Sequence, residues 1–134
     1  MSRNAATLRA FRKPRMWLMF WGLMIVAVVV LSLMPKPPIP PTLMVGKRDH
    51  LIAYAALAAM AVQLYQALRT QLGVALALVA LGVVLELAQG YLTSYRHMAA
   101  YDALVDALGV ALGLATTRTR LATVLLRIDG RMSG

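Results

Sequence analysis

Four apolar segments follow one another along the chain, each close to the roughly 20 residues that a helix needs to cross a bilayer. The first, residues 16–34, carries no charge, and the second, residues 50–68, is rich in alanine. The third covers residues 72–92 and the fourth residues 98–117, with a tight turn predicted at residues 69–71. The pattern predicts an all-α, polytopic membrane protein whose four transmembrane helices form one compact domain.

Composition supports this interpretation, because 60% of the 134-residue chain is hydrophobic. Soluble domains usually contain about 45–50% apolar residues, so a water-soluble core is the poorer interpretation. The N-terminal segment is longer than a typical signal-peptide core and lacks an Ala-x-Ala-like exit, so we interpret it as a retained helix. The sequence has no cysteine, which excludes disulfides and thiol chemistry.

Basic residues concentrate outside the apolar segments and predict an orientation. With the N-terminus inside, ten Lys and Arg residues flank the cytoplasmic ends of the segments, against four on the other side. We therefore expect a multi-pass protein of the bacterial inner membrane, whose basic N-terminus (residues 1–15) and basic tail (residues 118–134) are both cytoplasmic. Residues 121–128 of this tail are expected to lie along the inner surface as a short amphipathic element.

The net charge of +9 also bears on the expected partners. The basic residues sit beside membrane segments, and no recognisable nucleic-acid-binding module is present. Anionic membrane lipids explain the charge with fewer assumptions. We therefore expect membrane lipids as partners and no nucleic acid, and we predict no oligomeric state.

Glu86 is the only charge between residues 71 and 94, and an ionisable group inside a membrane segment is costly and by default marks a functional site. At 1.5 Å per residue it falls about 9 Å below the predicted outer end of its helix. Polar residues of the second and fourth segments fall near the same depth. With Glu86 they form a predicted outer-leaflet cluster that contains His50, Tyr54, Gln89, Asp102 and Asp106.

Helical spacing places the two aspartates on a face of small residues. Asp102, Asp106, Gly109 and Gly113 follow one another at intervals of four, three and four residues. Such a stripe of carboxylates and glycines is expected to pack against other helices rather than lipid.

The chemistry of the cluster suits an anionic ligand or proton transfer. The candidates for holding a phosphate group are Lys47, Arg48 and Arg96. The candidate catalytic residues, which would orient or protonate the bound group, are Glu86, His50 and Asp102. The remaining ligand-binding candidates are Tyr54, Gln89 and Asp106. No close ligand pair such as His-x-x-x-His is present, so we predict neither a metal nor another cofactor.

Three functions remain open on these residues. The first is binding of an anionic envelope lipid or a polyprenyl-phosphate-linked cell-wall precursor in an outer-leaflet pocket. The second is a membrane enzyme that acts on a lipid-linked phosphate group. The third is a structural accessory of an envelope complex, in which the polar groups only pin the helices together.

Short motifs at these positions carry a resemblance. Residues 47–54 (KRDHLIAY), residues 86–89 (ELAQ), Arg96 and residues 102–109 (DALVDALG) together resemble the VanZ-like family of small bacterial membrane proteins. The resemblance covers about residues 34–113 and implies an influence on susceptibility to the glycopeptide teicoplanin. The positions that match the family's characteristic polar residues are Lys47, His50, Tyr54, Glu86, Gln89, Arg96 and Asp102.

The chain departs from the family pattern at two positions. Gly46 stands where the family usually has an aspartate, and Asp106 stands where it has an asparagine. Asp49 could offset the first change, and the second adds a buried acid.

Overall fold

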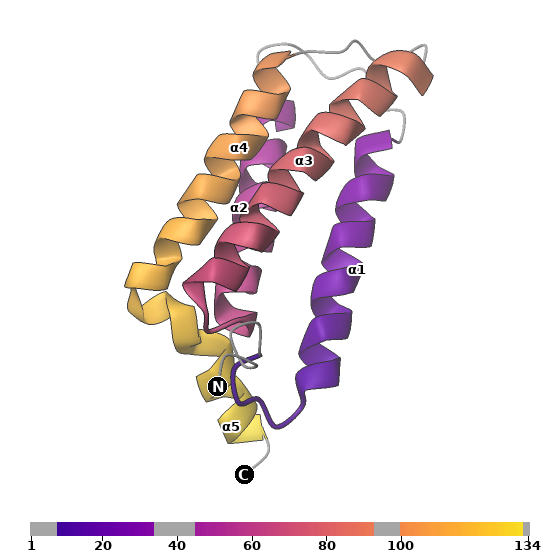
Figure 1. Cartoon of the computed structure of the whole chain (residues 1–134). Coiled ribbons are helices and arrows are strands. Elements are labelled where there is room, and N and C mark those ends of the chain that lie inside the picture. Colours follow the sequence, from indigo (N-terminus) through magenta and orange to yellow (C-terminus); the bar gives the residue numbers. More distant parts are fainter. Residues whose placement is uncertain (1–7, 34–44, 93–99, 133–134) are drawn as a thin grey trace.

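The computed structural model describes residues 8–33, 45–92 and 100–132, and of residues 45–49, 92, 100 and 101 it describes the backbone alone. All the elements in these ranges are helices, as predicted. Four of them are long and lie along one another as a bundle (Figure 1). These are α1 (Pro14–Leu33), α2 (Val45–Leu64), α3 (Leu68–Leu92) and α4 (Ala100–Ala115). Two short 3-10 helices, η3 (Thr116–Arg118) and η4 (Arg120–Thr123), then lead to α5 (Val124–Met132) at one end of the bundle.

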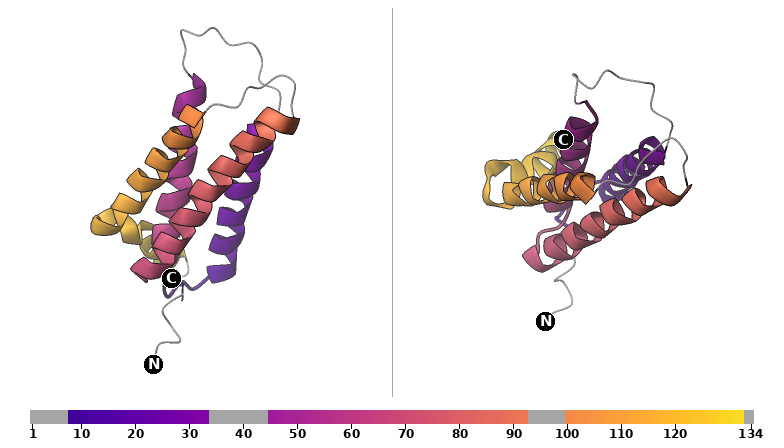
Figure 2. Two further views of the ribbon diagram at one scale, coloured as in Figure 1. Left: turned by 45° about the horizontal axis from the view of Figure 1, so that its top comes forward. Right: turned by 90° about the horizontal axis from the view of Figure 1, so that it is seen from above.

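α2 is the central helix, and it packs most extensively against α4. Glycines allow this close approach: a Cβ atom built on Gly109 would lie 2.6 Å from the carbonyl oxygen of Leu51, and one built on Gly113 would collide with the carbonyl oxygen of Ala55. Seen from above, α4 lies over α2, α3 runs beside α4, and α1 lies next to α3 (Figure 2). The prediction that the glycine face of α4 packs against another helix is therefore confirmed.

The apolar core lies between α2, α3 and α4. Its buried members include Tyr54 and Leu57 of α2, Leu78 of α3 and Val110 of α4. α1 closes the bundle from one side, and its Trp21 indole donates a hydrogen bond of 3.1 Å to the carbonyl oxygen of Leu57. This bond ties α1 to the middle of α2, where the two helices otherwise meet through apolar side chains.

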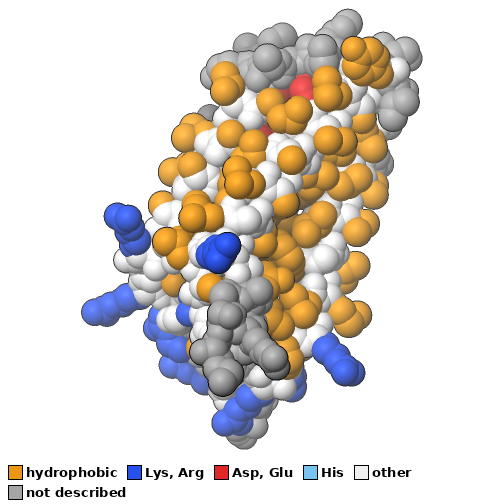
Figure 3. Space-filling view, viewed as in Figure 1, with side chains coloured by type: hydrophobic (Ala, Val, Ile, Leu, Met, Phe, Trp, Pro, Cys, Tyr) orange, Lys and Arg blue, Asp and Glu red, His pale blue; other side chains and the backbone are white. Residues whose placement is uncertain are grey.

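The face of the bundle in Figure 3 is apolar along most of its length. Met19 on α1 is 69% exposed, Leu76 on α3 is 72% exposed and Leu104 on α4 is 67% exposed. Two helices, Pro14–Leu33 and Leu68–Tyr91, are long and apolar enough to cross a membrane. The apolar part of α2 that follows His50 is shorter than a membrane span, as is α4.

The connection between α2 and α3 differs from the predicted one. α2 ends at Leu64 and α3 begins at Leu68, so residues 69–71 belong to the first turn of α3 and the predicted turn there is wrong. Carbonyl groups at the end of α2 and just after it accept hydrogen bonds from residues outside this helix. Arg9 donates from its backbone to Leu64 and from its guanidinium to Val62, and the Gln71 amide donates to the Tyr65 carbonyl oxygen at 2.8 Å.

Candidate functional site

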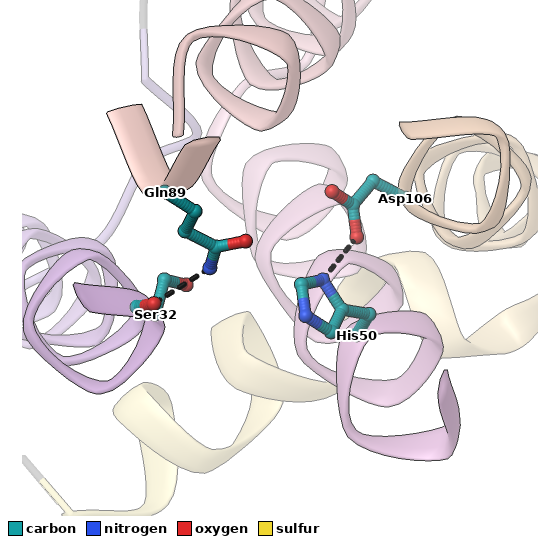
Figure 4. Close-up of polar contacts among 4 residues, drawn as sticks. All are labelled: Ser32, His50, Gln89 and Asp106. Atoms are coloured by element: carbon teal, nitrogen blue, oxygen red, sulfur yellow. Dashed lines mark hydrogen bonds and ion pairs between the residues drawn. The ribbon is translucent and has the colours of Figure 1, made fainter. Parts of the chain in front are cut away.

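The central contact of the candidate site joins α2 to α4. His50 Nδ1 lies 2.8 Å from Asp106 Oδ1, and the side chains are 13% and 2% exposed. Asp106 reaches from α4 to the imidazole on α2 (Figure 4). α3 approaches the same carboxylate through Gly82, where an added Cβ would lie 2.9 Å from Asp106 Oδ2. The glycine leaves the space that the carboxylate occupies between the three helices.

Pairing with Asp106 defines the roles of the two imidazole nitrogens of His50. When the carboxylate is ionised it only accepts hydrogen bonds, so Nδ1 carries the proton and Nε2 is the acceptor of the neutral ring. When the ring is protonated, the contact becomes an ion pair. A buried charge is tolerated only with a partner, and the 2.8 Å contact supplies one in either state. The arrangement can therefore hold or pass a proton without leaving an isolated charge.

Tyr54 and Glu86 complete this buried region. The ring of Tyr54 is parallel to the His50 ring, with an interplanar angle of 6° and ring centroids 6.5 Å apart. The Tyr54 phenol lies within electrostatic range of the carboxylates of Asp106 and Glu86. Tyr54 and Glu86 are both buried. The structure thus brings together predicted residues from α2, α3 and α4, and their proposed roles stay predictions.

Gln89 connects the site to α1. Its amide Nε2 donates a hydrogen bond of 2.6 Å to the backbone carbonyl oxygen of Ser32, and both residues are buried. Figure 4 shows the Gln89 side chain pointing from α3 toward α1. The NH2 group of the Gln89 amide therefore joins α3 to α1. Sequence reasoning missed Ser32, because the group that accepts this bond is a backbone carbonyl, which every residue carries.

The other predicted site residues are less fully placed. Asp102 is half-buried in the first turn of α4, where a negative charge is favourable to the helix dipole. Among the described residues it forms no hydrogen bond or ion pair. Lys47 and Arg48 lie in the first turn of α2, one turn before His50, but their side chains lie outside the described part. Arg96 lies wholly outside the described residues.

Metal binding finds no support in the described ranges, where no three His, Asp or Glu side chains lie close enough together to hold an ion. The site is instead a buried set of proton donors and acceptors. The chemistry that these residues offer is hydrogen bonding and proton exchange.

A third buried carboxylate, missed by sequence reasoning, lies at the opposite end of the bundle. Asp129 of α5 is 1% exposed and accepts hydrogen bonds from the Arg12 backbone N–H and from the Trp17 indole, the latter at 3.0 Å. Burial raises the pKa of Asp129, but these bonds, a bond from the Lys13 backbone and the Lys13 charge outweigh it and bring the pKa below its usual value. Its only signal in the sequence is a single acid within a basic tail.

Comparisons with protein-family models, curated proteins and solved structures find no match for this chain.

Proposed function

We propose that all four long helices cross the bacterial inner membrane, with the arginine-rich end in the cytoplasm. The exposed apolar side chains on α1, α3 and α4 support this, because water-soluble monomers rarely expose such a continuous apolar surface. Lys and Arg side chains gather at the end that holds α5 (Figure 3). That distribution follows the tendency of cytoplasmic flanks to be basic.

The function we propose is binding of an anionic headgroup, carried by an envelope lipid or a lipid-linked cell-wall precursor, at the His50 end of the bundle. The observation that carries it is the contact between the partly buried His50 ring, just after the first turn of α2, and the buried Asp106 carboxylate of α4, with buried Glu86 supplied by α3. That turn holds Lys47 and Arg48, and the N-terminus of a helix favours a negative charge. Phosphate would meet the cations first, with His50 below them as a hydrogen-bond partner.

The resemblance to the VanZ-like family is part of this proposal. It rests on the same polar positions and adds an effect on glycopeptide susceptibility. A deletion strain would test that effect by its teicoplanin sensitivity, with the intact gene and a His50→Gln allele as the two complementing copies.

Lipid copurification tests the binding proposal. The protein would be extracted in native nanodiscs, and its lipids compared by mass spectrometry with those of His50→Gln and of a Lys47→Gln, Arg48→Gln double variant. We expect enrichment of one anionic lipid class that falls in both variants and persists in Leu104→Ala, a control on the exposed face of α4. Unchanged lipid profiles in well-folded variants would refute the proposal.

A membrane enzyme is the second candidate, and the His50–Asp106 pair favours it. A carboxylate that orients an imidazole is a common arrangement for a general base. Turnover of a labelled polyprenyl-phosphate lipid by the purified protein would support this candidate if His50→Gln abolished it while lipid binding persisted. Absence of turnover in the native protein would leave binding as the function.

A further inference from the structure

The charge distribution differs sharply between the two ends of the bundle. At the end that holds α5, the exposed basic residues are Arg12, Lys13, Arg15, Arg69, Arg118, Arg120, Arg127 and Arg131. In the described part of the chain, the only carboxylate at this end is Asp129, which is buried and bonded to the start of α1. This surface therefore presents positive charge without acidic side chains to neutralise it.

Three hydrogen bonds fix the orientation of α5. Asp129 accepts from Arg12 and Trp17 of the N-terminal region, and the Gln63 side-chain oxygen accepts from the Leu125 backbone N–H at 2.9 Å. Residues 125 and 129 are four apart and share one helix face, which these bonds turn toward the bundle. The outward face is thus set by the fold before any partner binds.

The outward face combines arginine with apolar side chains. Arg127, Ile128, Arg131 and Met132 are exposed on α5, and Leu121 is exposed in η4 just before it. Arg127 is held in place by bonds from its guanidinium to the Arg120 carbonyl oxygen at 2.6 Å and to Thr123. Nucleic acid would match the charge alone. The boundary between lipid headgroups and acyl chains matches both the arginines and the apolar residues.

We infer that η4 and α5 form a docking surface for anionic phospholipid headgroups of the leaflet beside this end of the bundle. The arginines bind lipid phosphate, while Leu121, Ile128 and Met132 contact the upper acyl chains. The inference rests on membrane insertion, but not on headgroup binding at the His50 end. Lipid that binds here anchors the end at which the first and last helices meet.

The absence of cysteine makes a site-specific test direct. A fluorophore attached to Ile128→Cys in the full-length protein would be quenched by brominated lipids in vesicles of phosphatidylcholine with or without phosphatidylglycerol. We expect stronger quenching by brominated phosphatidylglycerol than by brominated phosphatidylcholine. Replacing Arg127 and Arg131 with Gln should lower this preference roughly fivefold per arginine, because each contributes about 1 kcal/mol near an anionic surface.

Three variants serve as controls. Arg127→Lys with Arg131→Lys keeps the charge and should keep most of the preference. Arg69→Gln removes a cation of α3 at the same end and should leave it unchanged, and so should His50→Gln, which separates this proposal from the one at the other end. Equal quenching by the two lipids, or quenching by neither, would overturn the inference. Binding of RNA to this face in place of lipid would also overturn it.

Discussion

The two ends of the bundle both bury carboxylates, and the partners of Asp106 at one end differ from those of Asp129 at the other. Asp106 lies against the His50 imidazole, a type of side chain that can both donate and accept a proton. Asp129 lies against the Arg12 backbone N–H and the Trp17 indole, which only donate hydrogen bonds. A carboxylate paired with a titratable ring can take part in proton exchange, whereas one held by fixed donors can only join segments. The partner, rather than burial itself, separates a candidate site from a structural contact.

The residues around the two carboxylates also differ. Asp106 belongs to a set of buried polar residues from α2, α3 and α4, with Glu86 and Tyr54 as neighbours. Asp129 stands alone beneath an arginine-rich surface. Mutations at the first end should therefore affect both stability and ligand binding, and mutations at the second should affect mainly the docking of α5.

The largest expected effect is at Asp106. Asp106→Ala leaves the His50 ring without its partner between three helices, and breaking a buried ion pair typically costs about 3–5 kcal/mol. The free energy of unfolding in detergent, measured by denaturant titration, should fall by an amount of that order. His50→Ala with Asp106→Ala should recover part of the loss, since neither polar group then remains unpaired. Additive effects of the two single changes would argue against the pair.

The next effect concerns the glycine contact that brings α4 to α2. Gly113→Ala places a methyl group against the Ala55 carbonyl oxygen, so the helices must separate at a cost of about 1–3 kcal/mol. Gly73→Ala is the matched control, because no atom lies within 4 Å of its added Cβ. The control should be neutral or slightly stabilising, as alanine favours helix over glycine. Thermal unfolding of both variants measures the difference, and equal losses would contradict the packing.

At the other end, the docking of α5 should weaken in acid. Because the folded pKa of Asp129 is lowered, its ionised form stabilises the fold above the unfolded value of about 3.9, and this contribution is lost as the pH falls through the folded pKa. Fluorescence of Trp17, whose indole donates to Asp129, would follow the release. Asp129→Asn should remove this transition. If the fluorescence transition of Asp129→Asn kept the same midpoint pH, the transition would belong to another titratable group.

The smallest effect is expected at Gln63, which accepts a hydrogen bond from Leu125 at the start of α5. Gln63→Leu should cost about 1 kcal/mol, the usual net value of one such bond. Hydrogen exchange should show faster opening of α5 and unchanged protection at residues 50–58 of α2. Faster exchange in both α5 and residues 50–58 would mean that the two ends of the bundle do not open independently.

Much of the fold was predictable from local pattern. The apolar segments predicted four long helices, and the spacing of Asp106, Gly109 and Gly113 predicted a packed face on α4. The grouping of His50, Glu86 and Asp106 followed from depth alone, because helices of alternating direction bring their polar residues to one level. These features depend on periodicity and length, which a sequence carries directly.

Other features depend on contacts between distant segments. At the end of α2, the carbonyl groups of Val62 and Leu64 accept bonds from Arg9, and no residue near the helix end predicts them. Asp129 gains its role only because α5 folds back onto the start of α1. The phosphate-binding roles of Lys47, Arg48 and Arg96 stay predictions, since their side chains lie outside the described residues.

The most direct test of the His50–Asp106 pair is the ¹⁵N spectrum of the histidine ring in lipid bilayers across neutral pH. The chain has two histidines, so a His97→Gln variant leaves the His50 signals alone. We predict a ring that carries a proton on Nδ1, with a hydrogen-bonded Nδ1 shift that Asp106→Asn alters. A ring protonated at Nε2 alone, or signals that do not respond to Asp106→Asn, would contradict the pair and with it the proposed site.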